Sequence, residues 1–338
     1  MNSKLNILIT TGIYPPKIGG PAQYAKNLKE EFEKKGHRVS VKTFGIENIL
    51  PTGVRHLWFA VKVIPQFLKS DVVFALDTFS VGAPSVFLGK VFGKKVIIRT
   101  GGDFLWEQYV ERTSKPILLR NFYETEAGFL TYKEKIIYSI TKWTLNNASR
   151  VVFSTEWQKQ IFVPAYVMDI SKTSIIENYY GPKEGVFETD SNLFVASVRD
   201  LKWKNINTLR KVAEKVSQAH SIHLLTENLT FLEFMKKIKL SRAVILVSLG
   251  DISPNMILDA IRYNKPFICT KEVGIYDRIK DAGTFVDPLN EDEIEKAILE
   301  FLDKEAYERA KERVKNFNFT HTWEEIAEEF IAITNSAQ

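Results

Sequence analysis

The sequence predicts an α/β protein built from two doubly wound domains in tandem. Short apolar runs alternate with amphipathic stretches of helical period along most of the chain. Several short runs are continuously apolar and rich in β-branched residues, as expected of parallel strands that helices cover on both faces. The alternation stops at residues 178–192 and then restarts. Because strands that alternate with helices form parallel sheets, we expect domains at 1–180 and 181–318, and a final helix over 319–338 that can cross back to the first domain.

In the first half, the expected elements follow one another in strand–helix order. The run LNILIT predicts the first strand. Residues 21–36 predict a helix, because Pro21 suits a helix start and Gly36 a helix end. The further expected strands are HRVSVKTF, DVVFAL, KKVIIRT and RVVFST, and the further helices are LWFAVKVIPQFLK and KEKIIYSITKWTLNNAS.

Residues 178–192 hold two glycines, a proline and several charges, which is typical of a linker. The strands expected beyond it are LFVASV, SIHLLT, AVILVSL, KPFICT and GTFVDP. The helices expected there are INTLRKVAEKVSQA, FLEFMKKIKL, residues 254–263 and three stretches that close the chain, the last of them HTWEEIAEEFIAIT. Since open α/β sheets bind ligands beyond the carboxyl ends of their strands, two such domains predict a binding cleft between them.

Composition narrows the class of protein. The 338 residues carry 46 Lys and Arg against 41 Asp and Glu, a net charge of +5. This suits a phosphate-bearing ligand or an anionic membrane surface, and is too weak to indicate nucleic acid. The single cysteine, Cys269, favours a reducing compartment. No stretch reaches the ~20 apolar residues of a membrane span, so we expect a cytoplasmic protein that can touch the inner face of the cell membrane.

The loop GIYPPKIGG leads from the first strand to the first helix. Gly19 and Gly20 before a helix start allow backbone N–H groups to approach a phosphate closely. The spacing is neither G-x-G-x-x-G nor G-x-x-x-x-G-K-[ST], which disfavours a dinucleotide dehydrogenase or a P-loop enzyme. An ordinary glycine turn explains the same residues equally well.

A pair of cations follows the first strand of the second half, in VASVRDLKWKNINTL. Arg199 and Lys204 can clamp a diphosphate there and neutralise the charge that develops as it leaves. A solvated basic loop is the simpler explanation when the stretch is taken alone.

Two acids surround an expected helix start in LGDISPNMILDA. Ser253 suits the N-cap and Pro254 the first helical position. Asp259 inside the helix suits a ribose diol, while Asp251 precedes the helix. The alternative is a surface helix, in which Asp251 interacts favourably with the helix dipole and Asp259 is an ordinary surface acid. The amide groups expected to stay free are those of Asn255, Met256 and Ile257.

The stretch IIRTGGDFLWEQ places Asp103, Trp106 and Glu107 after a buried strand and two glycines. An aromatic ring between two acids resembles a sugar subsite. The alternative is a structural loop with Trp106 packed in the core.

Metal ligation is not indicated. The five histidines do not cluster with the single cysteine or with acids, and no D-x-D occurs. We therefore expect neither a metal nor a cofactor.

Taken in order, these stretches resemble the retaining glycosyltransferases of family 4, which have the GT-B architecture of two facing Rossmann-like domains. SVRDLKWKN is similar to the family's G-R-x-x-x-x-K-G/N element, with Arg199 and Lys204 on its cations. DISPNMILDAIRYNKPFI is similar to its E-x7-E segment, with Asp251 and Asp259 on its acids. The opening stretch and EVGIYDRIKDAGTFVDP also resemble the family.

The resemblance implies a nucleotide-sugar donor and metal-independent transfer with retention, onto a glycan or lipid-linked glycan in cell-surface polysaccharide or glycolipid biosynthesis. Arg199 and Lys204 would hold the diphosphate, Asp259 the ribose, and Asp251 would face the donor sugar. The pocket would also be lined by Gly19, Gly20, Ser253, Asn255 and Met256, and the acceptor would meet Tyr14, Trp106 and Glu107.

Three departures from the family stand out. Both acids are Asp rather than Glu. A histidine common in the family is replaced at Gly101, which makes Asp103 the substitute catalytic candidate. Only ENLTFLEFMKKIKLSR lies between two strands of the second domain, where the family has a further strand and helix, so the nucleobase stays open.

Two other functions remain open: a sugar-nucleotide epimerase of GT-B fold, against which the lack of a suitably placed histidine counts, and a non-catalytic sugar-nucleotide-binding protein. RHLWFAVKVIPQFLK and YKEKIIYSITKWTL mix cations with large apolar residues, as interfacial membrane helices do. Ordinary helices packed on a sheet are the simpler explanation of either stretch alone.

Overall fold

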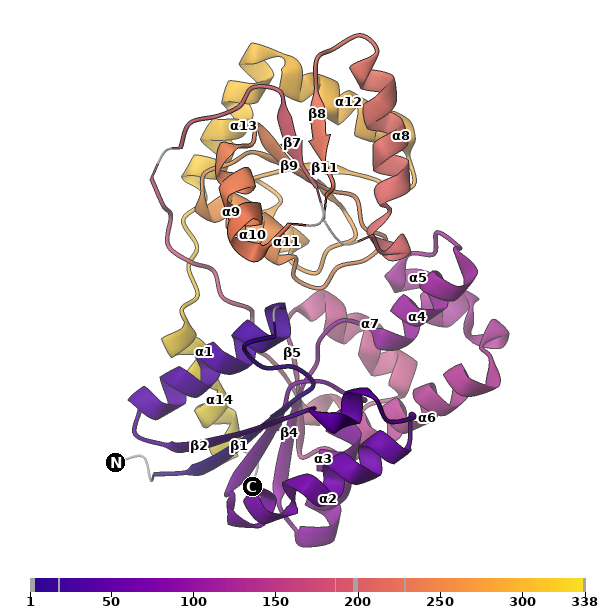
Figure 1. Ribbon diagram of the computed structural model, residues 1–338, viewed down its shortest axis with the longest axis vertical. Coiled ribbons are helices and arrows are strands. Elements are labelled where there is room, and N and C mark those ends of the chain that lie inside the picture. Colours follow the sequence, from indigo (N-terminus) through magenta and orange to yellow (C-terminus); the bar gives the residue numbers. More distant parts are fainter. Residues whose placement is uncertain (1–3, 18, 186, 197–199, 228, 337–338) are drawn as a thin grey trace. The chain divides into compact units, whose positions relative to one another are not determined.

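The computed structural model describes residues 4–17, 19–185, 187–196, 200–227 and 229–336 (Figure 1). The chain forms two compact units, each with its own parallel sheet. The first unit comprises Met1–Gly102, Leu130–Tyr179 and His321–Gln338, and the second comprises Asp103–Phe129 and Tyr180–Thr320. The predicted fold class of two Rossmann-like α/β units is confirmed.

The first unit contains a six-stranded parallel sheet in the order β2-β1-β3-β4-β5-β6. Its strands are β1 (Asn6–Thr11), β2 (Arg38–Thr43), β3 (Val72–Ala75), β4 (Lys95–Arg99), β5 (Arg150–Phe153) and β6 (Thr173–Ile175). Its helices are α1 (Gly20–Lys34), η1 (Ile46–Asn48), α2 (Val54–Lys69), α3 (Gly82–Phe92), α6 (Tyr132–Asn147), α7 (Glu156–Tyr166), η3 (Ile170–Lys172) and α14 (Trp323–Ser336).

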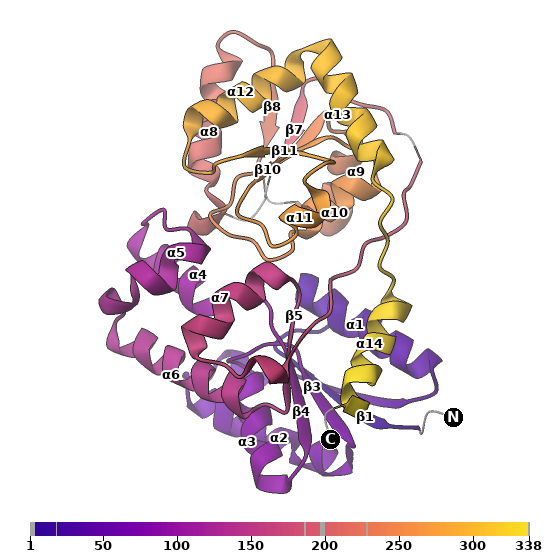
Figure 2. The ribbon, with the colours of Figure 1, turned by 180° about the vertical axis from the view of Figure 1, so that it is seen from behind.

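One face of this sheet is covered by α1 and α14, which lie side by side (Figure 2). Alternate residues of β1, such as Ile7 and Ile9, point into the core that these helices close. Phe330 of α14 packs edge-on against Phe74 of β3, with ring centroids 5.1 Å apart. The C-terminal helix thus completes the core of the first unit, although more than 140 residues of the second unit precede it in the chain.

The second unit contains a five-stranded parallel sheet in the order β11-β10-β9-β7-β8. Its strands are β7 (Leu193–Val195), β8 (His223–Leu225), β9 (Ala243–Leu246), β10 (Phe267–Thr270) and β11 (Thr284–Val286). Its helices are α4 (Phe104–Thr113), α5 (Leu119–Thr125), η2 (Ala127–Phe129), η4 (Lys202–Lys204), α8 (Ile206–Ser217), α9 (Phe231–Leu240), α10 (Asn255–Arg262), α11 (Tyr276–Ile279), α12 (Glu291–Leu302) and α13 (Lys304–Asn316).

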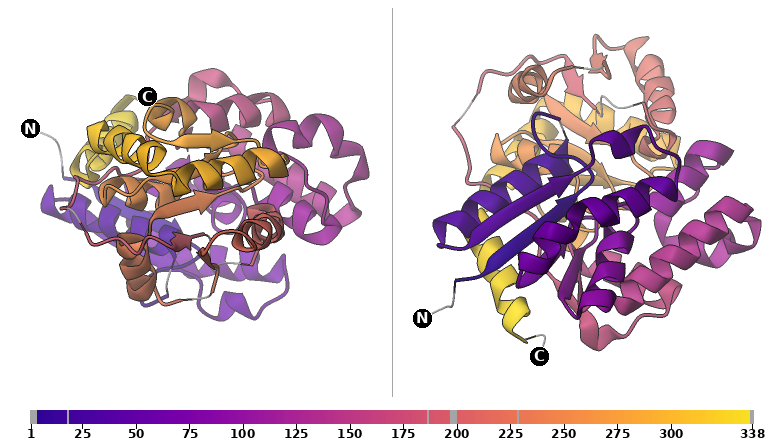
Figure 3. Two further views of the ribbon diagram at one scale, coloured as in Figure 1. Left: turned by 90° about the horizontal axis from the view of Figure 1, so that it is seen from above. Right: turned by 60° about the horizontal axis from the view of Figure 1, so that its bottom comes forward.

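Helices cover both faces of the second sheet (Figure 3). In β9, Val244 and Leu246 face the core formed with α9, α10 and α11. Ala243 and Ile245 face the core formed with α8 and α12. Burial on both faces explains why the strand sequences are continuously apolar rather than alternating.

Both units share one strand order, in which the first strand lies between the second and the third. The chain leaves β1 toward β2 and returns on its other side as β3, and β7, β8 and β9 repeat this path. The crevice between neighbouring strands whose connections diverge is where open α/β sheets bind ligands. The strand order therefore predicts ligand binding at the loops after β7 and β9, and at those after β1 and β3.

One stretch does not follow the sequence-based expectation. Residues 103–129, which we assigned to the first domain with the rest of 1–180, form α4, α5 and η2 and belong to the second unit. The apolar side chains of this segment, including Trp106 and Leu119, are buried there.

No helix in the described part of the chain combines the length and the apolar character that a membrane span requires.

Candidate active site at the strand ends of the second unit

The structure brings Lys204 and Asp251 together beyond the carboxyl ends of β7 and β9, the neighbouring strands of the second sheet whose connections run in opposite directions. Lys204 ends η4, after β7, and Asp251 follows β9. The Lys204 Nζ atom lies 2.6 Å from Asp251 Oδ2, and the two side chains are only 9% and 13% exposed. The pair is therefore a short, charge-assisted contact that is largely shielded from solvent.

Local structure holds Lys204 in place. Its ammonium lies 4.3 Å from the ring centroid of Trp203, which is itself buried. The next residue, Asn205, has a left-handed backbone (φ 55°), which turns the chain from η4 into α8. Asparagine tolerates that conformation better than most residues. The amphipathic stretch that follows forms α8 as expected.

Asp251 is held by its backbone. Its amide donates to Glu272 O at 2.9 Å, and its carbonyl accepts from Gly274 N at 2.9 Å. These bonds form an isolated parallel bridge between Asp251 and Val273, just beyond the ends of β9 and β10. Leu249 N also donates to Trp203 O at 2.9 Å, so the loop of Asp251 is tied to the loop of Lys204.

The start of α10 differs from the expectation by one residue. Pro254, not Ser253, is the N-cap, and no side chain caps the helix. Pro254 has an extended backbone (ψ 108°), so the helix can begin only after it. The amide of Ile257 donates to Pro254 O at 3.0 Å, so that amide is not free, contrary to our expectation.

The uncapped start of α10 leaves an anion-attracting group of donors. As the first two residues of the helix, Asn255 and Met256 have N–H groups without intrahelical acceptors. The buried Ser253 hydroxyl just before them has no hydrogen-bond partner in the described part of the chain. A bound phosphate or sugar oxygen would satisfy these donors.

Asp259 lies in the second turn of α10. Burial raises the pKa of its carboxyl group to about 6, an effect that nearby Arg262 opposes and Glu184 reinforces. Within the described residues, no hydrogen bond reaches its carboxylate. A carboxylate that is largely desolvated and still unpaired is suited to accept hydrogen bonds from a neutral diol.

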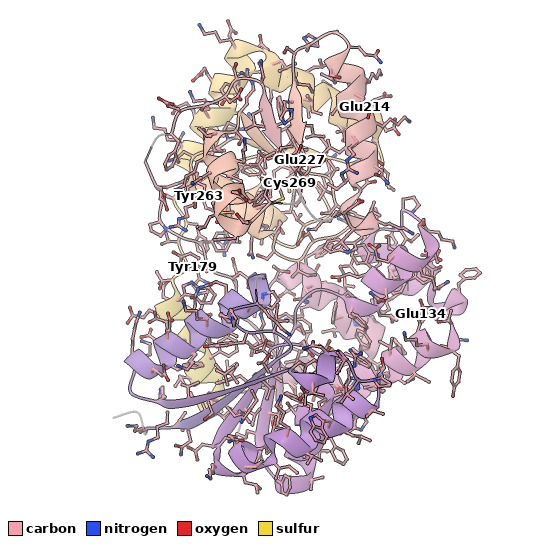
Figure 4. The ribbon with its side chains drawn as sticks, viewed as in Figure 1. Glu134, Tyr179, Glu214, Glu227, Tyr263 and Cys269 are labelled. Carbon is pink, nitrogen blue, oxygen red and sulfur yellow. The ribbon has the colours of Figure 1, made fainter. Side chains whose placement is uncertain are left out.

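Sequence reasoning missed the charges around Asp259. Glu184 forms ion pairs with Arg262 at 2.6 Å and with Lys239 at 3.0 Å. The Lys239 ammonium also lies 4.5 Å from the ring centroid of Tyr263, whose place at the end of α10 is labelled in Figure 4. Glu184 lies in the stretch that we predicted only as a linker, and its composition carries no signal for this role.

Sequence reasoning also missed Glu272 and its partner. Glu272 follows β10 as Asp251 follows β9, and its Oε2 atom accepts from Arg120 Nε at 2.6 Å. The position of Glu272 after a buried strand could have identified it. No local pattern pointed to Arg120, because it lies in the α4–α5 stretch of the first half of the sequence.

Asp103 and Trp106 have structural roles. The Asp103 carboxylate caps α4 by accepting from Trp106 N at 3.0 Å, and its second oxygen accepts from the Tyr123 hydroxyl. Burial raises the pKa of this carboxyl group. Both oxygens of Asp103 thus make structural hydrogen bonds, and the catalytic role that we expected of this residue stays a prediction.

Trp106 is 1% exposed, and its indole N–H donates to Ile117 O at 3.0 Å. A ring buried to this extent has no free face for a sugar, so its expected acceptor role is not supported. Glu107, in the first turn of α4, stays partly exposed.

The remaining predicted residues lie in the first unit or outside the described residues. Gly19 is the N-cap of α1 and Gly20 its first residue, and no side chain caps this helix. Tyr14 lies earlier in the same loop, where its carbonyl accepts from Lys17 N at 3.1 Å. Arg199 lies outside the described residues.

Within the described ranges, no group of three or more His, Cys, Asp or Glu residues could hold a metal ion. Cys269, the free cysteine labelled in Figure 4, is buried in β10, and burial raises its pKa.

The sequence matches no protein-family model and no curated protein, but the fold matches known structures. Anabaena HepE in complex with UDP-glucose aligns over 99% of this chain and all of its own, with 13% identity and a TM-score of 0.64. The catalytic domain of Arabidopsis thaliana starch synthase IV, bound to ADP and acarbose, aligns over 99% of each chain with 13% identity and a TM-score of 0.66. WaaG, a glycosyltransferase involved in lipopolysaccharide biosynthesis, aligns over 97% of this chain and 99% of its own, with 13% identity and a TM-score of 0.65.

At this level of identity the likeness shows the fold. The chain has the GT-B fold of two Rossmann-like units that these glycosyltransferase structures share. A fold alone does not define a reaction, so the evidence for function lies in the residues at the strand ends.

Proposed function

We propose that the protein is a glycosyltransferase of family 4, which moves a sugar from a nucleotide-sugar donor to a glycan or lipid-linked glycan with retention of configuration and without a metal. The observation that carries the proposal is the Lys204–Asp251 pair beside the uncapped start of α10. Lys204 supplies a cation for a diphosphate, and the free amides at the start of α10 suit phosphate or sugar oxygens. The unpaired carboxylate of Asp259, eight residues after Asp251, suits a ribose.

In this proposal Lys204, together with Arg199, stabilises the charge that develops on the departing diphosphate. The amides of Asn255 and Met256 bind phosphate or sugar oxygens, with the Ser253 hydroxyl beside them. Asp259 accepts hydrogen bonds from the ribose diol. In the transfer step the anomeric C–O bond to phosphate breaks, a C–O bond to the acceptor forms on the same face, and the leaving phosphate takes the acceptor's proton.

Gly19 and Gly20, at the uncapped start of α1, are proposed to bind oxygen atoms of the donor, and Tyr14 and Glu107 to contact the acceptor. HepE was crystallised with UDP-glucose and starch synthase IV with ADP, so uridine and adenine donors are the first to test. A thermal-shift screen with UDP, GDP, ADP and TDP identifies the base, because a ligand that binds the folded state raises its apparent stability.

We further propose that the acceptor lies at a membrane, in polysaccharide or glycolipid biosynthesis at the inner face of the cell membrane. Support comes from α2, which buries Phe59 and Phe67 on one side and exposes apolar residues on the other. Neighbouring α3 adds further exposed apolar residues. The exposed residues of this α2–α3 face are Val54, Leu57, Trp58, Val61 and Leu68 of α2, and Phe87, Val91 and Phe92 of α3.

The charges of the α2–α3 face complement an anionic bilayer. Neither helix contains an acidic residue, and Lys69 and Lys90 are exposed beside the apolar residues. Apolar side chains flanked by cations are typical of interfacial helices. The other stretch that we predicted for the membrane forms α6, which contacts α3 and exposes Ile136 and Trp143.

The test is incubation with a panel of nucleotide sugars and acceptor lipids, followed by measurement of free nucleoside diphosphate. Acceptor-dependent release that is lost in Lys204→Ala supports transfer. Conversion of the donor sugar to an isomer without transfer supports an epimerase instead. Binding without turnover of any donor supports a non-catalytic sugar-nucleotide-binding protein.

A further inference from the structure

The segment Asp103–Phe129, which contains α4, α5 and η2 and which we call the α4–α5 segment, contacts each loop of the candidate active site. It interrupts the first unit in the sequence, yet it packs within the second unit. Figures 1 and 2 show α5 close to the start of α8, and α4 lies against η4. Its contacts go to three places that are far apart in the sequence.

The first contact is with the loop that carries Lys204. Glu111 Oε1 accepts from Lys202 N at 2.7 Å, and Lys202 Nζ donates back to Glu111 O at 2.7 Å and to Ser114 Oγ at 2.8 Å. The ring of Trp106 lies against that of Trp203, with centroids 5.7 Å apart. Trp203 in turn lies beneath the Lys204 ammonium, so the segment supports the platform on which this cation rests.

The second contact is with the loop that carries Asp251. Leu119 N donates to Leu249 O at 3.2 Å. The backbone of Gly250 approaches so closely that an added Cβ would lie 2.6 Å from Leu119 Cβ and 3.2 Å from the Trp106 ring. Only glycine fits beside the segment at this position, immediately before Asp251.

The third contact is the ion pair of Arg120 with Glu272 at 2.6 Å. The carbonyl of Glu272 accepts the amide of Asp251 at 2.9 Å. One cation of the segment therefore holds the residue whose backbone aligns Asp251. Every loop that shapes the Lys204–Asp251 pair thus has a partner in the α4–α5 segment.

We propose that the α4–α5 segment positions Lys204 and Asp251, and that Arg120 is a positioning residue of the candidate active site although it lies in the first half of the chain. The expected loss of catalytic rate rests on the proposed function, whereas the expected change in the order of the site loops does not. An enzyme that stabilises a leaving diphosphate depends on cations fixed before the reaction, since small displacements lower the rate strongly.

The chain offers a closely matched control. Lys115, in the same segment, pairs with Glu126 at 2.9 Å, and the two side chains are 48% and 9% exposed. The corresponding values for Arg120 and Glu272 are 45% and 7%. The two pairs differ in that Glu126 lies within the segment and also accepts from the Tyr109 hydroxyl, whereas Glu272 lies on a site loop.

The experiment compares Arg120→Met with Lys115→Met in the full-length protein. Hydrogen exchange is measured at the amides of Leu249, Asp251 and Gly274, together with kcat and KM for donor turnover. We expect Arg120→Met to accelerate exchange at these amides and to lower kcat about tenfold, with the global unfolding midpoint no lower than that of Lys115→Met. The charge-swapped double variant Arg120→Glu/Glu272→Arg should recover part of the protection and of kcat.

Equal exchange at the three amides in both variants would overturn the proposal, whatever the activity. Faster exchange in Arg120→Met alone supports the positioning role even if the wild-type protein turns over no donor, an outcome that would contradict the proposed function instead. If Arg120→Met does not fold, Arg120→Gln, which also removes the charge but keeps a polar side chain, replaces it under the same criteria.

Discussion

Lys204 and Asp251 form a buried ion pair, with 2.6 Å between Nζ and Oδ2, across 47 residues of sequence. The pair has consequences for both stability and ligand binding. Removing one partner leaves an unpaired charge in a place that water reaches poorly, whereas removing both does not.

Lys204→Met should lower the free energy of unfolding by about 3–5 kcal/mol, because it leaves Asp251 as an unpaired buried charge. The double variant Lys204→Met/Asp251→Asn should be more stable than Lys204→Met alone. Urea unfolding of the wild type, of the single variants Lys204→Met and Asp251→Asn, and of the double variant measures both differences. Additive effects of the two substitutions would contradict a direct interaction.

Asp251→Asn should strengthen the binding of a nucleoside diphosphate and weaken transfer. In the wild type, the Asp251 charge neutralises Lys204 and repels the diphosphate, so its removal should tighten binding about tenfold. Transfer should slow, because the resemblance to family 4 implies that Asp251 faces the donor sugar. Calorimetry measures the affinity for the diphosphate, and turnover is measured on the same samples. Weaker diphosphate binding in Asp251→Asn would contradict the proposal that the diphosphate binds beside Lys204.

Asp259 should make nucleoside binding depend on pH. Its carboxyl pKa is raised to about 6, so the ionised form that accepts from a ribose diol becomes populated as pH rises through 6. The affinity for the nucleoside diphosphate should increase over this range and lose that dependence in Asp259→Asn. Asp277→Asn, at an exposed position of α11, serves as the control.

The same group should oppose folding at neutral pH. Because its pKa is about 6 in the folded chain and 3.8 in the reference state, the folded protein binds more protons between these values. The stability contribution of Asp259 therefore falls as pH rises through this window. Asp259→Asn should be more stable than the wild type at pH 7, by at most about 3 kcal/mol, and the difference should disappear near pH 4. A less stable variant at pH 7 would show that the carboxylate is favourably paired.

The α2–α3 face should mediate binding to anionic vesicles. Leu57→Ser with Trp58→Ser removes two large exposed apolar side chains from α2, which should lower the partition coefficient by at least about tenfold. The matched control is Phe231→Ser with Leu232→Ser, an exposed apolar pair on α9 of the second unit. Flotation at low and moderate salt provides the measurement, and an absence of wild-type co-flotation at both salt concentrations would contradict the membrane proposal.

Transfer should persist in EDTA. In this proposal the charge on the leaving diphosphate is stabilised by Lys204, Arg199 and the amides of α10 rather than by a cation bridged by acids. Turnover is measured with and without chelator, with added Mg²⁺ as the comparison. Loss of activity in EDTA that Mg²⁺ restores would contradict metal independence.

Much of the candidate site could be predicted because its residues lie at strand ends. Continuous apolar runs identified β7 and β9, and the residues that follow such strands lie at one edge of the sheet by construction. That is why Lys204 and Asp251 could be singled out from two separate stretches. The cap of α10 was misplaced by one residue, because both Ser253 and Pro254 suit a helix start and local preference does not separate them.

The α4–α5 segment could not be assigned from its sequence. Asp103 and Trp106 lie three positions apart after a buried strand, and the same residues suit either a sugar subsite or a capped, buried helix. The role of Trp106 depends on the residues that cover its ring. These are Trp203 and Gly250, both about 100 residues or more further along the chain. No local pattern records such partners.

The sequence by itself determined the two parallel sheets, their helices and the residues at their strand ends, because apolar periodicity and turn chemistry act over a few residues. Only the tertiary structure decided which sheet the α4–α5 segment joins, which acids stay unpaired and which become caps, and that α14 completes the first core. Those outcomes depend on the burial of apolar surface between segments distant in the chain, and on which partner each polar group meets there.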